Sequence, residues 1–329
     1  KFKYYVKRFK IKDYMNWLTK FIKASEKIKT AIRKRASKSE IAASKYMSCH
    51  GVPVEKKIIE QNNFVCPECN RHHFLSPSQR FNMMFGENNW KEIKGAMVKD
   101  IDPYKWEDTK KYTDRLADAK KKTGQDCAIL SCEAKINDID IVVSAVNFSW
   151  IGGSISMNEG ENVLKSVQTA IDKKCPYIFF SGSGGMRMMT NMLSLMQMTR
   201  MTIAINELKK NNLPYIVVIS NPTTGGLSAS IVSTSDICIG EGGPNGGATY
   251  AFAGRRIVEA TTKSDLPSDF QTVSWQKSKG QVDMVLDRKD ITPTIGTLLS
   301  ILLKKHKSKN IEENDSLIEE TTQETKEAS

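Results

Sequence analysis

Residues 181–187 read Ser-Gly-Ser-Gly-Gly-Met-Arg, and this stretch decides the fold. The apolar run before it, residues 177–180, predicts a buried strand, and the apolar periodicity of residues 192–208 after it predicts a helix. Small residues at a turn from strand to helix leave backbone N–H groups unpaired at the strand end. The turn is therefore a candidate site for binding negative charge.

A second turn of the same kind follows. Residues 215–219 predict another buried strand, which runs into Asn-Pro-Thr-Thr-Gly-Gly at 221–226 and then into a small-residue helix start at 228–230. A lone glycine pair after a strand is usually only a turn. Two pairs at matched positions can direct two sets of N–H donors at one oxygen, as an oxyanion hole requires. The residues predicted to be catalytic are Gly184, Gly185, Gly225 and Gly226.

The rest of the body alternates strands with helices, which predicts an α/β fold with parallel strands and right-handed crossovers. Because the glycine-rich turns recur, we expect a spiral of strand–strand–helix units. Residues 76–135 are expected to form mostly helices and connectors, among them a lysine-rich helix that ends at Gly124. Strands are expected at residues 139–146, 177–180, 215–219, 237–239 and 282–285, and helices at 160–173, 192–210, 255–262 and 291–305.

Charge divides the 329 residues into a body and two ends. Residues 1–45 contain 15 Lys and Arg against three acidic residues, which accounts for the whole net charge of +12 and predicts a basic helical arm. Residues 306–329 hold seven acidic residues and predict a disordered acidic tail. Between them we expect a cysteine segment at 46–75 and one large domain at 76–305. No apolar run is long enough for a membrane span and no signal-peptide core is present, so we expect a cytoplasmic protein.

Seven cysteines without a secretory signal indicate free thiols in a reducing compartment, and three of them can form a zinc ribbon. Cys66 and Cys69 form a CxxC knuckle, and Cys49 precedes it at a spacing that can fold back on one Zn²⁺. A complete ribbon needs a further cysteine where Tyr46 stands. Either a histidine supplies the fourth ligand, or the ribbon has lost its metal and is held by packing. The candidate histidines are His50, His72 and His73.

Catalysis by a Ser-His-Asp triad within the body is excluded. Residues 74–305 contain no histidine. Ser183 lacks the first glycine of a nucleophile elbow, and neither a Walker lysine motif nor a dinucleotide fingerprint is present. What remains is catalysis by positioned backbone N–H groups. This suits chemistry through an enolate, where negative charge grows on a thioester oxygen.

Five motifs occur in order along the chain, and together with the cysteine segment they resemble one family. It is the carboxyltransferase β subunit of multi-subunit acetyl-CoA carboxylase, and the resemblance covers about residues 46–303. It implies a crotonase-like ββα spiral fold with a small N-terminal zinc-ribbon-like segment. The motifs are residues 147–154 (NFSWIGGS), 183–188 (SGGMRM), 193–198 (LSLMQM), 222–230 (PTTGGLSAS) and 252–257 (FAGRRI).

The resemblance also implies a reaction and its partners. A carboxyl group moves from carboxybiotin to acetyl-CoA, giving malonyl-CoA for fatty-acid synthesis. Biotin is held on a separate carrier protein, biotin carboxylase is a further partner, and the active site lies between this chain and an α subunit in an α2β2 assembly. By position, the two glycine pairs are oxyanion-hole residues, and Cys49, Cys66 and Cys69 hold Zn²⁺. The residues implied to bind substrate are Ser183, Arg187, Gly152, Gly153 and Arg255, although a surface salt-bridge role stays open for the arginines.

Four departures from the family pattern leave alternatives open. Tyr46 replaces a zinc cysteine, residues 157–159 (MNE) replace small and β-branched residues, residues 189–191 (MTN) replace Gln-Glu-Gly, and residues 242–249 form a longer connector. One alternative is a carboxyltransferase for another acyl-CoA, and a second is a non-catalytic subunit that only completes the complex. A third is a nucleic-acid-binding protein that uses the ribbon and the basic arm. A plastid-type organelle is the alternative location.

Overall fold

The computed structural model describes residues 45–49 and 51–303. Within these ranges the chain forms two compact units. The first contains the described residues up to Asn62 together with Cys66–Cys69, and the second contains Asn63–Val65 and the described residues from Asn70 onward. The predicted basic arm, apart from its last residue, and the predicted acidic tail lie outside the described residues.

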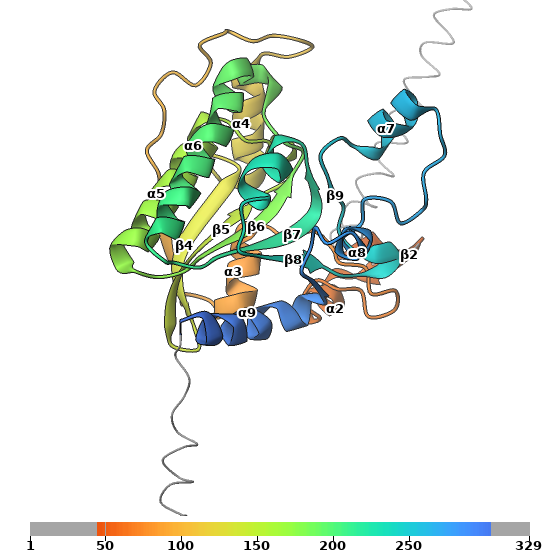
Figure 1. Cartoon of the computed structure of the whole chain (residues 1–329). Helices are drawn as coiled ribbons and strands as arrows, with labels where there is room; N and C mark the ends of the chain where they lie inside the picture. Colours follow the sequence, from red (N-terminus) through yellow and green to blue (C-terminus); the bar gives the residue numbers. More distant parts are fainter. Residues whose placement is uncertain (1–44, 50, 304–329) are drawn as a thin grey trace, which may run out of the picture. The chain divides into compact units, whose positions relative to one another are not determined.

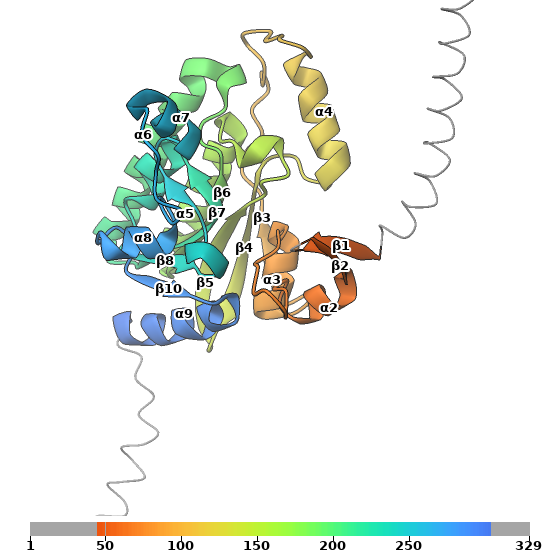
Figure 2. The ribbon, with the colours of Figure 1, turned by 90° about the vertical axis from the view of Figure 1, so that its right-hand side faces the viewer.

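The first unit contains a β-hairpin and a short helix (Figure 2). β1 (Tyr46–Cys49) and β2 (Val52–Glu55) pair antiparallel, and α2 (Lys56–Gln61) follows. Gly51, in the turn, has a φ of +84°, a left-handed conformation that glycine adopts without steric cost. Ile59 is fully buried, but the unit is too small to bury a large apolar core.

The second unit is built around one mixed sheet (Figure 1). Its strands lie in the order β10-β8-β7-β6-β5-β4-β3, and the short β9 also pairs with β7. The pairs from β5 through β10 are parallel, as expected, whereas β3–β4 and β4–β5 are antiparallel. The strands are β3 (Lys91–Ile93), β4 (Ile129–Ile136), β5 (Ile139–Val146), β6 (Tyr177–Ser183), β7 (Tyr215–Thr224), β8 (Ile237–Glu241), β9 (Tyr250–Ala251) and β10 (Met284–Leu286).

Helices cover both faces of this sheet (Figures 1 and 2). α5 (Met157–Lys173) and α6 (Asn191–Lys210) pack together on one face, and α3 (Pro77–Phe85) and α9 (Arg288–Leu302) lie on the other. Among the described helices, none combines the length and apolar character of a membrane span. The others are α4 (Tyr112–Thr123), α7 (Arg255–Thr262) and α8 (Val273–Ser278), with single turns η1 (Ile151–Gly153), η2 (Met188–Thr190), η3 (Ser228–Val232) and η4 (Pro244–Gly246).

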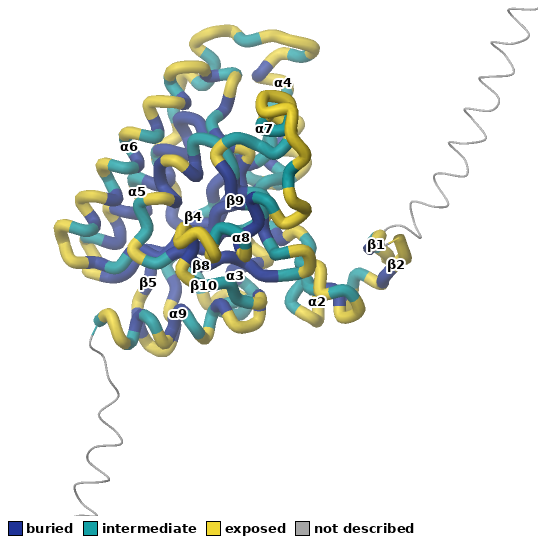
Figure 3. The backbone as a smooth tube through the Cα atoms, turned by 45° about the vertical axis from the view of Figure 1, so that its right-hand side comes forward, coloured by how far each residue is buried: buried dark blue, intermediate teal, exposed yellow. Residues whose placement is uncertain are grey.

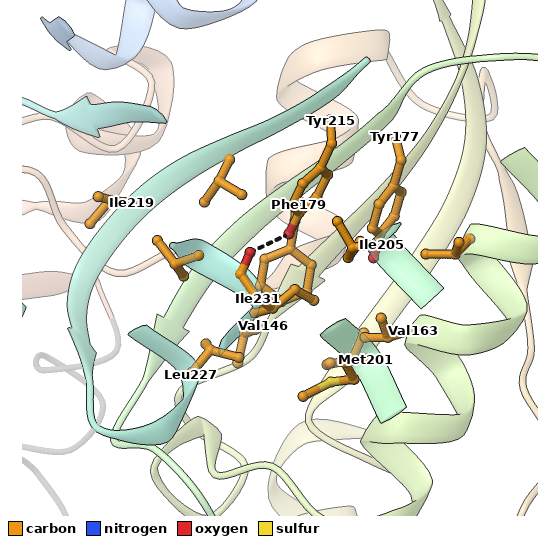
Figure 4. Close-up of a cluster of buried hydrophobic side chains, with 14 of the residues drawn as sticks. Val146, Val163, Tyr177, Phe179, Met201, Ile205, Tyr215, Ile219, Leu227 and Ile231 are labelled. Atoms are coloured by element: carbon orange, nitrogen blue, oxygen red, sulfur yellow. Dashed lines mark hydrogen bonds between the residues drawn. The ribbon is translucent and has the colours of Figure 1, made fainter. Parts of the chain in front are cut away.

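The central strand divides the core in two, because side chains alternate along a strand. In β6, Tyr177 and Phe179 pack toward α5 and α6, whereas Ile178 and Phe180 pack toward α3 and α9. The strands are buried along most of their length (Figure 3). Figure 4 shows the first cluster, in which the Tyr177 ring stacks on that of Tyr215 with centroids 5.5 Å apart. A core on each face fixes the sheet, so the ends of its parallel strands are rigid.

One strand in residues 76–135 was not predicted. Mostly helices and connectors were expected there, but β4 pairs with β5 along its full length. Its apolar signal is interrupted by Glu133 and Lys135, which lie at the partly buried and exposed positions of a strand that is otherwise mostly buried. The hairpin of β4 and β5, followed by α5, forms one complete ββα unit.

Other boundaries move by a few residues. α5 begins at Met157, before the expected residue 160, because Ser156 and Glu159 form a capping box. β6 continues beyond residue 180 because Ser183 still pairs with Thr223 of β7. The helix expected at 291–305 is α9, which begins at residue 288, and β10 lies slightly later than the expected 282–285. The lysine-rich helix is confirmed as α4, capped by Gly124 at a φ of +70°, and the helix at 255–262 is confirmed as α7.

Candidate active site

The two predicted glycine turns lie against each other at the ends of β6 and β7. A Cβ atom on Gly185 would lie 3.3 Å from Gly225 Cα and 3.4 Å from Gly226 N. Gly185 has a φ of +112° and Gly225 a φ of +69°, conformations that other residues rarely adopt. Glycine is therefore required at both positions by close approach as well as by backbone conformation.

A third glycine turn, η1, packs beside the first. The Gly184 N–H group donates to the Gly152 carbonyl oxygen at 2.9 Å. A Cβ atom on Gly153 would collide with the Gly182 carbonyl oxygen. The structure thus brings Gly152 and Gly153 next to the Gly184 turn, although whether they contact substrate stays a prediction.

Most of the predicted N–H donors are already engaged within the protein. Gly184 donates to Gly152, Gly185 donates to the Ser183 hydroxyl at 2.9 Å, and Gly225 donates to the Phe252 carbonyl at 2.9 Å. Of the four predicted donors, only the Gly226 N–H group finds no acceptor in the described part of the chain. The catalytic role of the four glycines stays a prediction, but their N–H groups are not four equivalent donors.

One further N–H group is free at the first turn. The Ile155 N–H group donates to the Gly185 carbonyl, and the Arg187 N–H group donates to the Ile155 carbonyl. The Met186 N–H group lies between these two bonds and points away from Ile155. Within the described residues, it donates to no protein atom. The two turns together therefore present the N–H groups of Met186 and Gly226, one from each strand end. Met186 gives no such signal in the sequence, because only the folded turn shows which N–H groups are paired.

Ser183 is fully buried and braces the first turn. Its hydroxyl accepts from the Gly185 N–H group and lies 3.3 Å from the Gly185 carbonyl, to which it donates. A hydroxyl engaged in this way shapes the turn. Contact between Ser183 and substrate stays a prediction.

Arg187 is not a surface residue. Its guanidinium group lies 2.7 Å from Glu159, donates to the Tyr112 hydroxyl at 3.0 Å and donates through Nε to the Ser154 hydroxyl at 3.1 Å. Burial opposes the charge, but Glu159 and Tyr112 outweigh it, so the pKa of Arg187 is raised. A surface salt bridge is therefore wrong for this residue, and its donors face protein partners rather than a ligand.

Glu159 connects Arg187 to the backbone around the turn. One carboxylate oxygen accepts from the Ala128 N–H group, and the other accepts from the Ser156 N–H group, both at 2.9 Å. Neighbouring Asn158 accepts from the Val98 N–H group at 2.9 Å. Residues at which the chain departs from the family pattern are thus buried supports of the site. The Ser-x-x-Glu capping box was the sequence signal that could have identified Glu159.

Arg255 lies at the start of α7 and holds its own loop. It donates to Glu259 at 2.7 Å and to the carbonyl groups of Leu266 and Pro267. No described contact joins it to the glycine turns, so its contact with substrate stays a prediction.

Cys49, Cys66 and Cys69 come together in the first unit, with their sulfur atoms within 4.8 Å of one another. The Cys49 and Cys69 sulfur atoms are 3.3 Å apart. Burial opposes the thiolate form of Cys66, but the backbone N–H groups of Cys69 and Glu68 stabilise it and lower its pKa to about 7. Three converging thiols fit three ligands of a tetrahedral zinc site. Tyr46 supplies no such ligand, and His50 lies outside the described residues.

Comparison with known proteins identifies the family. A family model described as the carboxyl transferase domain matches residues 108–316. An acetyl-coenzyme A carboxylase carboxyl transferase subunit beta from Pelagibacter ubique (strain HTCC1062) is 47% identical over 301 residues, which are 92% of this chain and 96% of the relative. The chain belongs to this family. A further carboxyl transferase β subunit, from Rhodopseudomonas palustris (strain TIE-1), is 38% identical over 88% of this chain and 86% of its own length.

Solved structures share the fold at low identity. A Pseudomonas malonate decarboxylase hetero-tetramer in complex with malonate has a TM-score of 0.54 at 14% identity, over 69% of this chain and 82% of that chain. Transcarboxylase 12S with methylmalonyl-coenzyme A and methylmalonic acid bound has a TM-score of 0.53 at 20% identity. The match covers 68% of this chain and 41% of that chain. The crotonase-like fold predicted from the sequence is confirmed, and the β-subunit family places the chain among the transferases.

Proposed function

We propose that this chain is the β subunit of a carboxyltransferase that moves a carboxyl group from carboxybiotin to acetyl-CoA, forming malonyl-CoA. Membership of the β-subunit family over nearly the whole chain supports the proposal. The observation that carries the chemistry is a pair of N–H groups, on Met186 and Gly226, that donate to no described residue and lie on turns that approach each other closely. In this proposal biotin arrives on a separate carrier protein that biotin carboxylase loads.

The free N–H groups account for catalysis without a titratable side chain. Negative charge develops on the thioester oxygen as an enolate forms, or on the biotin ureido oxygen as its carboxyl group leaves. N–H donors that are already fixed stabilise this charge without reorganisation, and removing one such donor typically lowers kcat by about 10²–10³. Gly185 and Gly225 allow the two turns to approach, and Ser183 and Arg187 hold the first turn in place.

An exposed apolar surface lies beside the first turn and is evidence for a partner subunit. Met188 is 71% exposed and Met192 is 57% exposed, although both are large apolar side chains. Clustered exposed apolar side chains are typical of a protein–protein interface. We propose that the α subunit covers this surface and completes the active site in an α2β2 assembly. The other exposed members of the surface, all on α6, are Leu195, Met196 and Ile203.

The first unit is proposed to hold one structural Zn²⁺ through Cys49, Cys66 and Cys69. A small unit with a thin core gains much of its folding free energy from a metal. His50 or a solvent molecule would supply the fourth ligand, because Tyr46 replaces the fourth cysteine and neither His72 nor His73 groups with the three thiols in the described part of the chain. Elemental analysis of freshly purified protein should give about one zinc per chain, and Cys66→Ser should lower it. No zinc in either protein would mean that the ribbon is held by packing alone.

We place the enzyme in the cytoplasm. All seven cysteines are free thiols, including the three close together in the first unit, as expected for a reducing compartment. The relatives named above are bacterial, so a plastid-type organelle is not favoured.

The test is a carboxyltransferase assay on the chain co-expressed with its α subunit. Malonyl-CoA and free biotin are supplied, and acetyl-CoA formation is followed. Turnover that requires both chains supports the proposal. A stable complex without turnover contradicts it and favours the non-catalytic subunit, unless propionyl-type substrates react, which would assign another acyl-CoA. Binding of RNA or DNA that falls steeply with salt would instead favour the nucleic-acid alternative.

A further inference from the structure

The second unit contains a cavity of about 350 Å³ on the sheet face opposite α5 and α6. It opens at the ends of β5 to β8, where Gly182 and Asn221 form part of its wall. The rest of the wall comes from α3, α9, the segment before α3 and the connector after β8, which contributes residues 242–245, 247 and 248. Since a water molecule takes about 30 Å³ of liquid volume, the cavity has room for roughly ten heavy atoms. It is therefore large enough for a small metabolite or inorganic ion.

The charges in the wall are unequal. Arg80 lies 2.7 Å from one Glu241 oxygen and Arg288 lies 3.4 Å from the other, and all three side chains are buried. Burial opposes ionisation of Glu241, but the two arginines outweigh it and lower its pKa to about 2. One ionised carboxylate thus faces two buried guanidinium groups, and the exposed Arg71 adds a third positive charge to the wall. Two guanidinium groups against one carboxylate leave a net positive charge in the cavity wall, and this arrangement favours an anion.

Several polar atoms in the same wall have no partner. The Arg288 Nε, His72 Nδ1 and His73 Nε2 atoms are enclosed and form no hydrogen bond with the described residues. Burial first, and then the neighbouring arginines, lower the pKa of both histidines. The nearest other carboxylate is that of Asp287, 4.0 Å from His72 Nε2.

Arg288 is nevertheless held firmly, as a binding residue must be. Its other terminal nitrogen donates to the carbonyl groups of Asn63, Phe64 and His73 at 3.0–3.3 Å. Arg80 also donates to the Ser220 hydroxyl at 3.1 Å and lies over the Phe180 ring. The guanidinium groups are fixed before any ligand arrives, which reduces the entropy cost of binding.

We propose that this cavity binds one small oxyanion, a phosphate or a carboxylate group, separately from the glycine turns. The excess of fixed guanidinium charge supplies the attraction, since arginine recognises both groups through paired N–H donors. The proposal does not rest on the carboxyltransferase activity, because binding can be measured without turnover.

The test is calorimetric titration of the full-length chain with inorganic phosphate and, separately, with acetate, at constant ionic strength against chloride. We expect saturable binding of one of them at one site per chain, and the anion that binds identifies the group. The variants His73→Phe and His72→Phe should each weaken binding at least tenfold, because each replaces a polar imidazole in the cavity wall with an apolar ring. Arg115→Gln, which removes an arginine paired with Asp108 at the surface, is the matched control and should bind as the parent does.

Three results would overturn the proposal. The first is no saturable binding of either anion, which would leave Arg288 with a purely structural role, joining α9 to Asn63, Phe64 and His73. The second is unchanged affinity in both histidine variants. The third is competition between CoA and the bound anion, which would assign the cavity to the substrate itself.

Discussion

Two buried ion-pair networks lie on opposite faces of the same sheet, and they differ in how completely their charges are matched. On the α5 face, Arg187 pairs with Glu159, and both are tied to further hydroxyl and backbone groups. On the α9 face, Arg80 and Arg288 share the single carboxylate of Glu241 beside a cavity.

This difference indicates that the first network supports the glycine turn, whereas the second can bind a ligand. The matched network fills its space and fixes the turn that carries the free Met186 N–H group, so it leaves nothing for a ligand. The unmatched network leaves a positive charge, unpartnered nitrogen atoms and open volume. Both networks are rigid, but only the second has capacity for another charged group.

Breaking the matched network should have the largest effect. Glu159→Gln leaves the Arg187 charge buried without its carboxylate, and we expect a loss of about 3–5 kcal/mol in the free energy of unfolding, measured by urea titration. Glu161→Gln on the same helix is the control, because its partner Arg200 is 40% exposed and such pairs contribute about 0–1 kcal/mol. Equal losses in the two variants would show that the buried ion pair stabilises the fold no more than an exposed one.

The second prediction concerns the first glycine turn, which that network supports. Gly185→Ala places a side chain at a φ of +112° against Gly225, so the free N–H group beside it should shift and turnover should fall by about 10²–10³-fold. Backbone strain should also cost about 1–3 kcal/mol of stability.

Gly182→Ala is the matched control from the cavity side. Its Cβ atom would meet only Val146 at 3.7 Å and Ser220 at 3.8 Å, which is ordinary contact. Turnover and stability should therefore remain close to those of the parent. Similar kinetics for Gly185→Ala and Gly182→Ala would contradict the assignment of the first turn as the active site.

The two networks also show which parts of the site could not be predicted from the sequence. The glycine turns were predictable because strand, glycine pair and helix follow one another within a few residues. The networks were not, because Arg187 bonds to Tyr112 across 75 positions and Arg80 bonds to Glu241 across 161. Partners this far apart in sequence meet only when the sheet has formed. β4 was missed for a related reason, since its pairing with β5 outweighs its mixed polarity.

Glu241→Gln tests the unmatched network through acid stability. The folded pKa of about 2 lies below the ordinary value of 4.5, so the carboxylate stabilises the fold above about pH 4.5. This contribution is lost as the pH falls from about 4.5 to 2. We expect Glu241→Gln to cost about 2–3 kcal/mol at pH 7, less than Glu159→Gln because water or an anion in the cavity can reach the arginines.

Phosphate sharpens this test. If the cavity binds phosphate, the ligand should restore part of the stability that Glu241→Gln loses in chloride, because it replaces the missing negative charge. Unfolding midpoints in the two salts at equal ionic strength measure this. Glu259→Gln, which breaks the exposed pair with Arg255, is the control. Phosphate should not raise its stability relative to chloride, and its loss of stability in acid should match that of the parent. A variant as stable as the parent between pH 3 and 7 would contradict the role of Glu241.

The smallest expected effect compares one hydroxyl from each network. Tyr112→Phe removes the acceptor for Arg187 in a fully packed site, so an enclosed N–H donor loses its partner and about 1–2 kcal/mol is lost. Ser220→Ala removes the acceptor for Arg80 beside the cavity, where water can take its place, and should cost less than about 0.5 kcal/mol. Urea titration of both variants measures the difference. The same cost for both would mean that the cavity is as dry and as fully matched as the network behind the glycine turn, and would remove the basis for the comparison.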